Sequence, residues 1–256
     1  MRKLGKIPNL TTILGSRNLA LGEATAHELT SDGCKNIICH QLDISDQESI
    51  NNLRDFVVRD FGNLDILINN AAICYNDPTL YGKVPHTSFQ QQAKPTIAVN
   101  FFGTLHVTQA MLPLLRSSSS PRIINVASAA GRLSILNSQE KLATFTSPTL
   151  QVSHLEDQMR AFVRDVEDGS HRGKDWPNTC YGMSKLAIIA LTKVLARDEP
   201  TIMVNSVDPG YCATDQNANQ GTISAERGAR TPVWLAAADT SVGSGKHFYE
   251  QREIAW

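Results

Sequence analysis

The chain has 256 residues, with 24 lysines and arginines against 25 aspartates and glutamates, and its formal net charge is -1. This length suits a single α/β domain over residues 1–256, and the balanced charge argues against nucleic acid or an anionic membrane as partner. Five cysteines without CxxC spacing, no signal peptide and no apolar run of roughly 20 residues indicate a cytoplasmic protein without a disulfide framework, zinc site or spanning helix.

The first half of the chain alternates β-prone segments with helical patterns. Strands are expected at residues 10–14, 37–40 and 64–68. Asn18 is placed to cap a helix that ends near residue 31, and Ser45 or Asp46 to cap a second helix. The apolar residues of that second helix recur at helical spacing, namely Ile50, Leu53, Phe56, Val57 and Phe61.

The second half continues the alternation around one polar insertion. A helix is expected through residues 99–103 to about 115, followed by a strand at 123–126. The insertion covers residues 133–179, with a helix from 153 to about 168. The remaining expected elements are a helix that contains Tyr181, a strand at 201–207, a helix at 225–237 and a strand at 247–249.

Strands that alternate with helices predict a doubly wound parallel sheet, Rossmann-like, between two layers of helices. Ligands of such sheets bind outside the carboxyl ends of the strands. Residues with useful chemistry follow several expected strands, namely Arg17, Asp43, Asn70, Ser128 and Pro209-Gly210. We therefore expect a binding site at this edge of the sheet.

Tyr181 and Lys185 lie four residues apart within an expected helix. Residues at this spacing occupy the same helix face, so the phenol and the ammonium can share one small volume. A neighbouring cation favours the phenolate and lowers the pKa of the tyrosine toward the range useful for proton transfer. The pair is a candidate acid/base centre, although an amphipathic pair on a solvated face has the same spacing.

The motifs together resemble those of the short-chain dehydrogenases/reductases. The set comprises Asn69-Asn70-Ala71-Ala72, Asn100, Ser128, Tyr181 with Lys185, and Pro209-Gly210-Tyr211-Cys212-Ala213-Thr214, in that order. The long interval between Ser128 and Tyr181 is more narrowly similar to the monomeric carbonyl reductases. So are Trp176-Pro177, residues 40–44, residues 100–104 and Trp256. The resemblance covers nearly the whole chain and implies a monomer.

The resemblance implies a role for each catalytic residue in reducing a ketone, aldehyde or quinone. Tyr181 would donate the proton, and the Ser128 hydroxyl would polarise the carbonyl oxygen, where negative charge develops. Lys185 would lower the pKa of Tyr181, and Asn100 would support a water that leads from the lysine to solvent. Ser128, Tyr181 and Tyr211 would contact the substrate. Ser128 as a plain helix cap, or Asn100 as a partner of local backbone, stays open.

The resemblance also implies NADP(H) as the cofactor. Arg17 stands where an acidic residue would bind the ribose of NAD, and an arginine there pairs with the 2'-phosphate of NADP. The other implied cofactor contacts form a larger set: Asp43 and Ile44 at the adenine, Asn70 and Ala71 at its ribose, Tyr181 and Lys185 at the nicotinamide ribose, and Pro209, Gly210, Cys212, Ala213 and Thr214 around the nicotinamide.

The family's first strand and its Gly-rich loop have no counterpart in the sequence. Residues 10–14 match the second strand of the family, and residues 1–6 match the end of its first helix. In the order 3-2-1-4-5-6 the missing strand leaves a gap in the centre of the sheet, unless the flanking strands re-pair. The chain is then an NADPH-dependent carbonyl reductase or an inactive truncated remnant, such as a splice form, that acts as a binding protein. A hydroxysteroid or retinoid dehydrogenase differs only in substrate.

Overall fold

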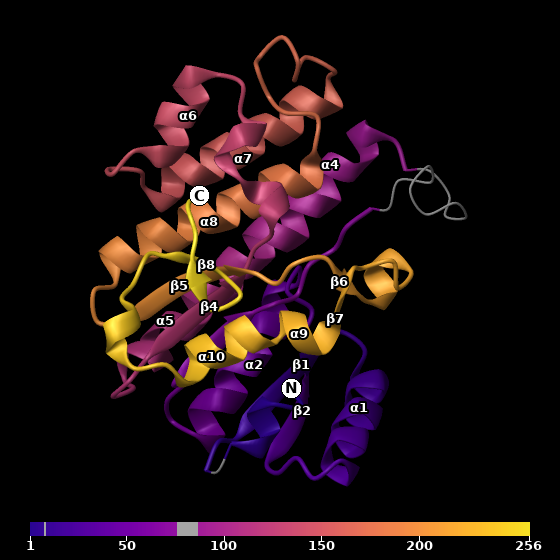
Figure 1. Cartoon of the computed structure of the whole chain (residues 1–256), viewed down its shortest axis with the longest axis vertical. Helices are drawn as coiled ribbons and strands as arrows, with labels where there is room; N and C mark the ends of the chain where they lie inside the picture. Colours follow the sequence, from indigo (N-terminus) through magenta and orange to yellow (C-terminus); the bar gives the residue numbers. More distant parts are fainter. Residues whose placement is uncertain (8, 76–86) are drawn as a thin grey trace.

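The computed structural model describes residues 1–7, 9–75 and 87–256 (Figure 1). Strands alternate with helices, as the sequence predicts. The strands are β1 (Thr12–Ser16), β2 (Ile37–Gln41), β3 (Ile66–Asn69), β4 (Arg122–Val126), β5 (Met203–Asp208), β6 (Cys212–Ala213), β7 (Ile223–Ser224), β8 (His247–Tyr249) and β9 (Arg252–Glu253). The helices are α1 (Leu19–Ser31), α2 (Gln47–Asp60), α4 (Phe89–Ile97), α5 (Thr104–Arg116), α6 (Gln139–Thr146), α7 (Val152–Glu167), α8 (Cys180–Asp198), α9 (Ala225–Gly228) and α10 (Arg230–Ala237).

The main sheet has five strands in the order β3-β4-β5-β8-β9. The first four strands are parallel, and β9 returns antiparallel to β8. Helices α5 and α8 pack against β3, β4 and β5, while α10 packs against β4 and β5 with a separate apolar cluster. These layers confirm the predicted Rossmann-like α/β/α fold.

Strands β1 and β2 form their own parallel pair, at the bottom of Figure 1 beside α1. Among the described residues, no strand pairs with the second edge of β1 or with the edge of β3 that faces away from β4. The two flanking strands have therefore not re-paired, and the sheet is divided at the place where the sequence predicts a gap.

The hydrogen bonds show which backbone groups lie at these free edges. Thr12 N donates to Asn36 O, and Ser16 O accepts from Leu42 N, so the even-numbered residues of β1 bond to β2. In a parallel ladder alternate residues point to opposite edges, which places the backbone groups of Ile13 and Gly15 on the free side. By the same alternation, Arg122 N donates to Asp65 O, so Ile66 and Ile68 face the free side of β3.

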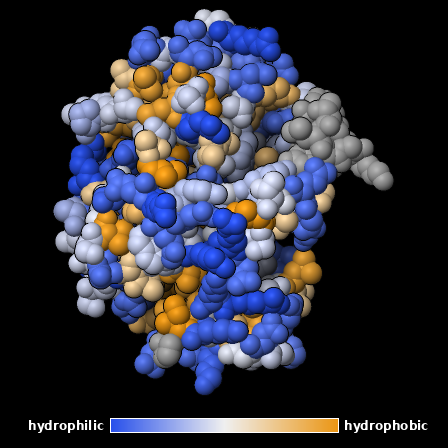
Figure 2. All heavy atoms as spheres, viewed as in Figure 1, coloured by the Kyte–Doolittle hydropathy of each residue, from blue (hydrophilic) through white to orange (hydrophobic). Residues whose placement is uncertain are grey.

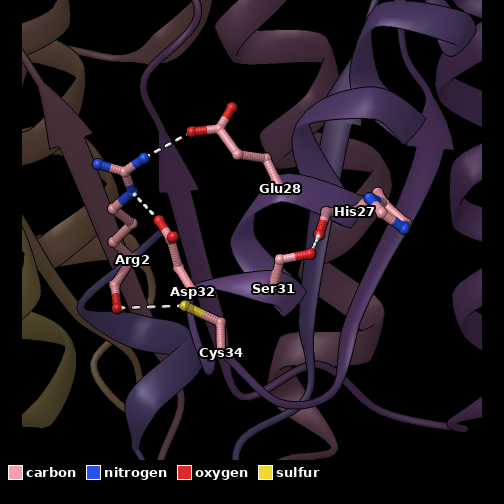
Figure 3. A network of polar contacts seen from close by, with 6 residues as sticks. All are labelled: Arg2, His27, Glu28, Ser31, Asp32 and Cys34. Atoms are coloured by element: carbon pink, nitrogen blue, oxygen red, sulfur yellow. Dashed lines mark hydrogen bonds and ion pairs between the residues drawn. The ribbon is translucent and has the colours of Figure 1, made fainter.

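The first residues of the chain tie the β1–β2 unit to the rest of the fold. Arg2 makes ion pairs with Glu28 at 2.6 Å and Asp32 at 3.0 Å, and its carbonyl accepts a hydrogen bond from the thiol of Cys34 (Figure 3). Leu4, which is 7% exposed, belongs to the apolar cluster beneath α10. This segment therefore contacts both α1 and the main sheet.

One continuous helical stretch, Phe89–Arg116, is long and apolar enough to cross a membrane by length and composition alone. It contacts α2, α7 and α8 and contributes Phe101, Leu105 and Met111 to the main apolar core. These contacts are those of a core helix. The face in Figure 2 is mainly hydrophilic, with apolar residues in small scattered groups.

The helix expected at 225–237 is divided into α9 and α10, and several other features of the described fold were not predicted. Helix α6 lies in the insertion, and a π-helical turn, Ala98–Gly103, joins α4 to α5. The two-residue strands β6 and β7 pair in parallel, and β9 follows the last predicted strand. These strands have two residues each, which is too short for an alternating apolar pattern to be recognised. The predicted helix at 153–168 is confirmed as α7.

Candidate active site

Tyr181 and Lys185 lie in the first turns of α8. Thr179 begins this helix, since its side chain accepts a 2.9 Å hydrogen bond from Gly182 N. Lys185 is only 4% exposed, and its Nζ donates a 2.7 Å hydrogen bond to the carbonyl of Val126, the last residue of β4. The same Nζ lies 5.6 Å from the centre of the Tyr181 ring. The two side chains thus share one volume beside the end of β4.

Ser128 follows β4 and begins the 3₁₀ turn Ala129–Gly131. Its Oγ accepts a 3.2 Å hydrogen bond from Ala130 N, and the same hydroxyl lies close enough to the Tyr181 phenol to lower the pKa of that phenol. Gly131 allows the turn to approach α8 closely, because a Cβ on residue 131 would lie 2.5 Å from the backbone carbon of Lys185. Ser128 therefore caps a turn, the alternative left open by the sequence, and also contacts the phenol.

Asn100 links α8 to the segment after β3. Its Oδ1 accepts from Ile73 N at 2.8 Å, and its Nδ2 donates to Ile73 O at 2.9 Å and to Ser184 Oγ at 3.0 Å. Asn100 is 1% exposed and lies in the π-helical turn, a local distortion that recurs at functional sites. Its amide satisfies local backbone and also fixes the residue next to Lys185.

The electrostatics of Tyr181 differ from the sequence-based prediction. Burial raises the pKa of Tyr181, the charge of Cys74 adds to this rise, and the hydrogen bond from Ser128 opposes it. Burial lowers the pKa of Lys185 to about 8, with the charge of Cys74 acting in the opposite direction. The expected fall in the Tyr181 pKa is therefore wrong for this state of the protein. Desolvation of the phenol outweighs the lysine, whose ammonium is directed to Val126.

Cys74 was not among the predicted site residues. It follows the Asn69–Ala72 motif, and its charge affects the pKa of both Tyr181 and Lys185. Burial raises the pKa of Cys74, so the thiol carries this charge only at alkaline pH. The sequence offered no signal beyond its position after the motif.

The predicted adenine-side residues gather at the carboxyl ends of β1 and β2. Arg17 is exposed directly after β1, and Asp43 and Ile44 follow β2. Two hydrogen bonds from Ser45, through its side chain at 2.6 Å and its backbone N at 2.9 Å, lower the pKa of Asp43, and the charge of Arg17 contributes. Within the described part of the chain, Arg17 makes a hydrogen bond through its backbone carbonyl and none through its guanidinium.

The remaining predicted cofactor residues follow β3 and β5. Asn70 and Ala71 are exposed after β3. The loop Pro209–Thr214 is braced by Asn217, which donates to Cys212 O at 2.8 Å and accepts from Thr214 N at 3.1 Å. Cys212 and Ala213 form β6.

These residues fit a dinucleotide at its two ends. An exposed guanidinium suits a ribose phosphate, and the buried Lys185 suits the hydroxyl groups of the other ribose. Within residues 1–7, 9–75 and 87–256, no Gly-rich turn between a strand and a helix presents backbone N–H groups to the pyrophosphate. The described residues therefore fit the two riboses of the dinucleotide and not its pyrophosphate.

A cavity of about 210 Å³ lies beside Ser128. Asp208, His247 and Trp256 line it, and none of them was a predicted binding residue. Tyr211, predicted to contact the substrate, is 46% exposed and does not line this cavity. A useful sequence signal for Asp208 was its place between a strand and Pro209-Gly210, where the site residues of such sheets gather.

Comparison with known proteins decides the family. The profile of the short chain dehydrogenases matches residues 8–139. The chain belongs to this family. It is 35% identical to carbonyl reductase 1 (NADPH) of Bos taurus over 95% of this chain and 88% of that protein. It is 37% identical to carbonyl reductase 3 (NADPH) of Mus musculus over 88% of this chain and 80% of that protein.

Solved structures of short-chain dehydrogenases have the same fold. Salutaridine reductase of Papaver somniferum superposes with a TM-score of 0.86 and 26% identity, covering 96% of this chain and 93% of that one. Menthone neomenthol reductase of Mentha piperita superposes with a TM-score of 0.81 and 28% identity, covering 97% of this chain and 92% of that one. Family membership makes this short-chain dehydrogenase an oxidoreductase that uses a nicotinamide cofactor.

Proposed function

We propose that this short-chain dehydrogenase is an NADPH-dependent carbonyl reductase that reduces ketones, aldehydes or quinones. The observation that carries the proposal is the convergence of Ser128, Tyr181 and Lys185 at the end of β4. Relatives named as NADPH-using carbonyl reductases support the substrate class and the cofactor. A cytoplasmic monomer is the corresponding proposal for location and assembly.

Each residue has a distinct role in the proposed reaction. NADPH supplies the hydride when it is bound. Tyr181 is a phenol and therefore protonated at neutral pH, and burial raises its pKa further; it delivers the proton to the carbonyl oxygen. Ser128 donates a hydrogen bond to the same oxygen, where negative charge develops.

Lys185 and Asn100 support the proton donor. The Lys185 ammonium binds ribose hydroxyl groups and returns a proton toward Tyr181. Asn100 is a positioning residue, since it acts through Ser184 and Ile73. Arg17 pairs with the 2'-phosphate, which favours NADPH over NADH.

Replacing Tyr181 tests the catalytic part of the proposal. In Tyr181→Phe, menadione-dependent oxidation of NADPH falls by a factor of about 100 to 10,000, because the general acid is lost while the buried ring remains. The NADPH dissociation constant changes little. A matched control is Tyr249→Phe, which removes a phenolic hydroxyl from β8. Undiminished turnover in Tyr181→Phe would sink the acid role.

A second candidate is a binding protein without turnover. The division of the sheet between β1 and β3 favours it, because Arg17 and Lys185 then lie on units that no strand joins among the described residues. Such a protein would bind a carbonyl ligand near Ser128 and leave NADPH unoxidised. The Tyr181→Phe experiment separates the two candidates, since only the reductase has a rate to lose.

A further inference from the structure

A buried carboxylate lines the cavity beside Ser128. Asp208, the last residue of β5, is 7% exposed and lines the cavity together with His247. Arg132 also lines it, but its side chain is exposed and its Nε donates to Ala129 O at 2.8 Å. The guanidinium is therefore the exposed charge of the lining, and the carboxylate is the buried one.

Asp208 has unused capacity to accept hydrogen bonds. Its Oδ1 accepts from Gly210 N at 2.9 Å, and no other donor to its side chain is found among the described residues. A carboxylate has about four acceptor positions, and the oxygens of Asp208 are not among the fully buried unpartnered atoms of the described residues, so its remaining positions are open to the cavity. The bond to Gly210 does not require a charge, because an asparagine would accept it equally well. The carboxylate therefore has acceptor positions available to a ligand in the cavity.

His247 extends the same wall. In the β5–β8 register Ser206 lies opposite His247, so Asp208, two residues after Ser206, is a diagonal neighbour on the same face. The ring Nδ1 lies 2.9 Å from Ser206 Oγ, and that hydroxyl lies 3.4 Å from Lys246 O, to which it donates. In the tautomer in which Ser206 donates to Lys246 O, Nδ1 donates to Ser206 Oγ and Nε2 is left as an acceptor. Burial lowers the pKa of His247, which keeps the ring neutral.

We propose that Asp208 and His247 form a subsite for a hydrogen-bond donor, a hydroxyl or an ammonium group, on the carbonyl substrate. The inference rests on the proposed function, because it names the substrate class of that site. Ser128 connects the two, since it contacts Tyr181 and also lines the cavity. A substrate whose carbonyl lies at Tyr181 directs its donor group to Asp208 and His247.

Ligand binding tests the subsite without depending on turnover. Three probes of similar size are compared by calorimetry, namely meta-ethylacetophenone, meta-hydroxymethylacetophenone and meta-aminomethylacetophenone. The wild-type chain binds at least one donor-bearing probe about tenfold more tightly than the ethyl probe, the scale of about 1.4 kcal/mol. A preference for the amine alone identifies an ammonium ligand, and one for both donors identifies a hydroxyl-type hydrogen bond.

Asp208→Asn is the decisive variant, because it keeps an acceptor for Gly210 N and removes the charge. It abolishes the preference for the amine, and His247→Phe weakens the preference for either donor. Asp239→Asn is the matched control, since Asp239 accepts a similar 2.8 Å bond from Ser241 N at an exposed turn elsewhere. The control keeps the wild-type preferences.

Two results overturn the inference. One is equal binding of all three probes by the wild-type chain, and the other is a donor preference that survives in both Asp208→Asn and His247→Phe. Menadione reduction is measured in parallel on the wild-type chain. A donor preference without menadione reduction would reject the reductase and keep the subsite. Menadione reduction without a donor preference would keep the reductase and reject the subsite.

Discussion

The ammonium of Lys185 donates its hydrogen bond to Val126 O at 2.7 Å and lies 5.6 Å from the centre of the Tyr181 ring. The end of β4 therefore fixes the lysine beside the phenol. Since Lys185 is almost fully buried, its charge is costly, and its pKa falls to about 8. The cation that the proposed proton path needs is thus titrated close to neutral pH.

Carbonyl reduction should fall as the pH rises through about 8, because the Lys185 ammonium loses its proton there. Lys185→Arg keeps a cation at every accessible pH, so its lower rate should show no fall in this region. The pH profile of menadione reduction checks this. Folding stability changes in the opposite direction. Between the folded pKa of about 8 and the ordinary pKa of 10.5, Lys185 binds more protons in the unfolded chain than in the folded one, so the free energy of unfolding rises with pH. A wild-type rate that is flat through this range contradicts the role of the lysine.

Gly131→Ala should damage the site more than the fold as a whole. The added Cβ would lie 2.5 Å from the Lys185 backbone carbon, so the turn that carries Ser128 must move away from α8. We expect a loss of about 1–3 kcal/mol in unfolding free energy, the usual cost of overpacking, and a lower kcat. Gly173→Ala is the control, because its nearest atom would be 3.5 Å away. Urea unfolding and turnover provide the two measurements, and equal effects in both variants would contradict the close-approach argument.

Arg17→Asp should weaken binding of NADPH far more than that of NADH. The substitution replaces an exposed cation near the proposed 2'-phosphate by an anion, while NADH has only a hydroxyl group there. A loss of about 100-fold or more for NADPH corresponds to about 2.7 kcal/mol. Lys35→Asp makes the same charge change elsewhere in the β1–β2 unit and should have little effect. Parallel losses for both cofactors would remove the argument for phosphate recognition.

The free edges of β1 and β3 should be visible in hydrogen exchange. The amides of Ile13, Gly15, Ile66 and Ile68 face the free sides, whereas those of Leu14 and Leu67 bond to β2 and β4. We expect the first group to exchange faster than the second, in an alternating pattern along each strand. Residue-resolved exchange by NMR checks this. Uniform protection along β1 would mean that a partner strand covers its second edge.

Most of the main elements could be predicted because their signals are local. Asn18 and Asp46 cap α1 and α2 as expected, and the regular apolar spacing of α2 places Ile50, Leu53 and Val57 in the core. The four-residue spacing of Tyr181 and Lys185 needed only the geometry of a helix. The spacing could not show the direction of the ammonium, which depends on where β4 ends.

The rest of the site depends on contacts between distant segments. His247 meets Asp208 only through the β5–β8 register, and Trp256 reaches the cavity wall through a 2.9 Å bond from its ring nitrogen to Gly131 O. The raised pKa of Tyr181 reflects burial by the whole fold, which outweighs a neighbour that the sequence could identify. Local patterns do not encode these distances.

NADPH binding to the purified chain is the decisive measurement, because every proposed catalytic role requires the bound cofactor. We expect saturable binding in a fluorescence titration, with a melting temperature that rises as NADPH is added. At 100 times the dissociation constant the stabilisation is about 2.7 kcal/mol. NADH should give a smaller shift. A folded chain whose fluorescence and melting temperature do not respond to millimolar NADPH would contradict the account and leave the binding-protein alternative.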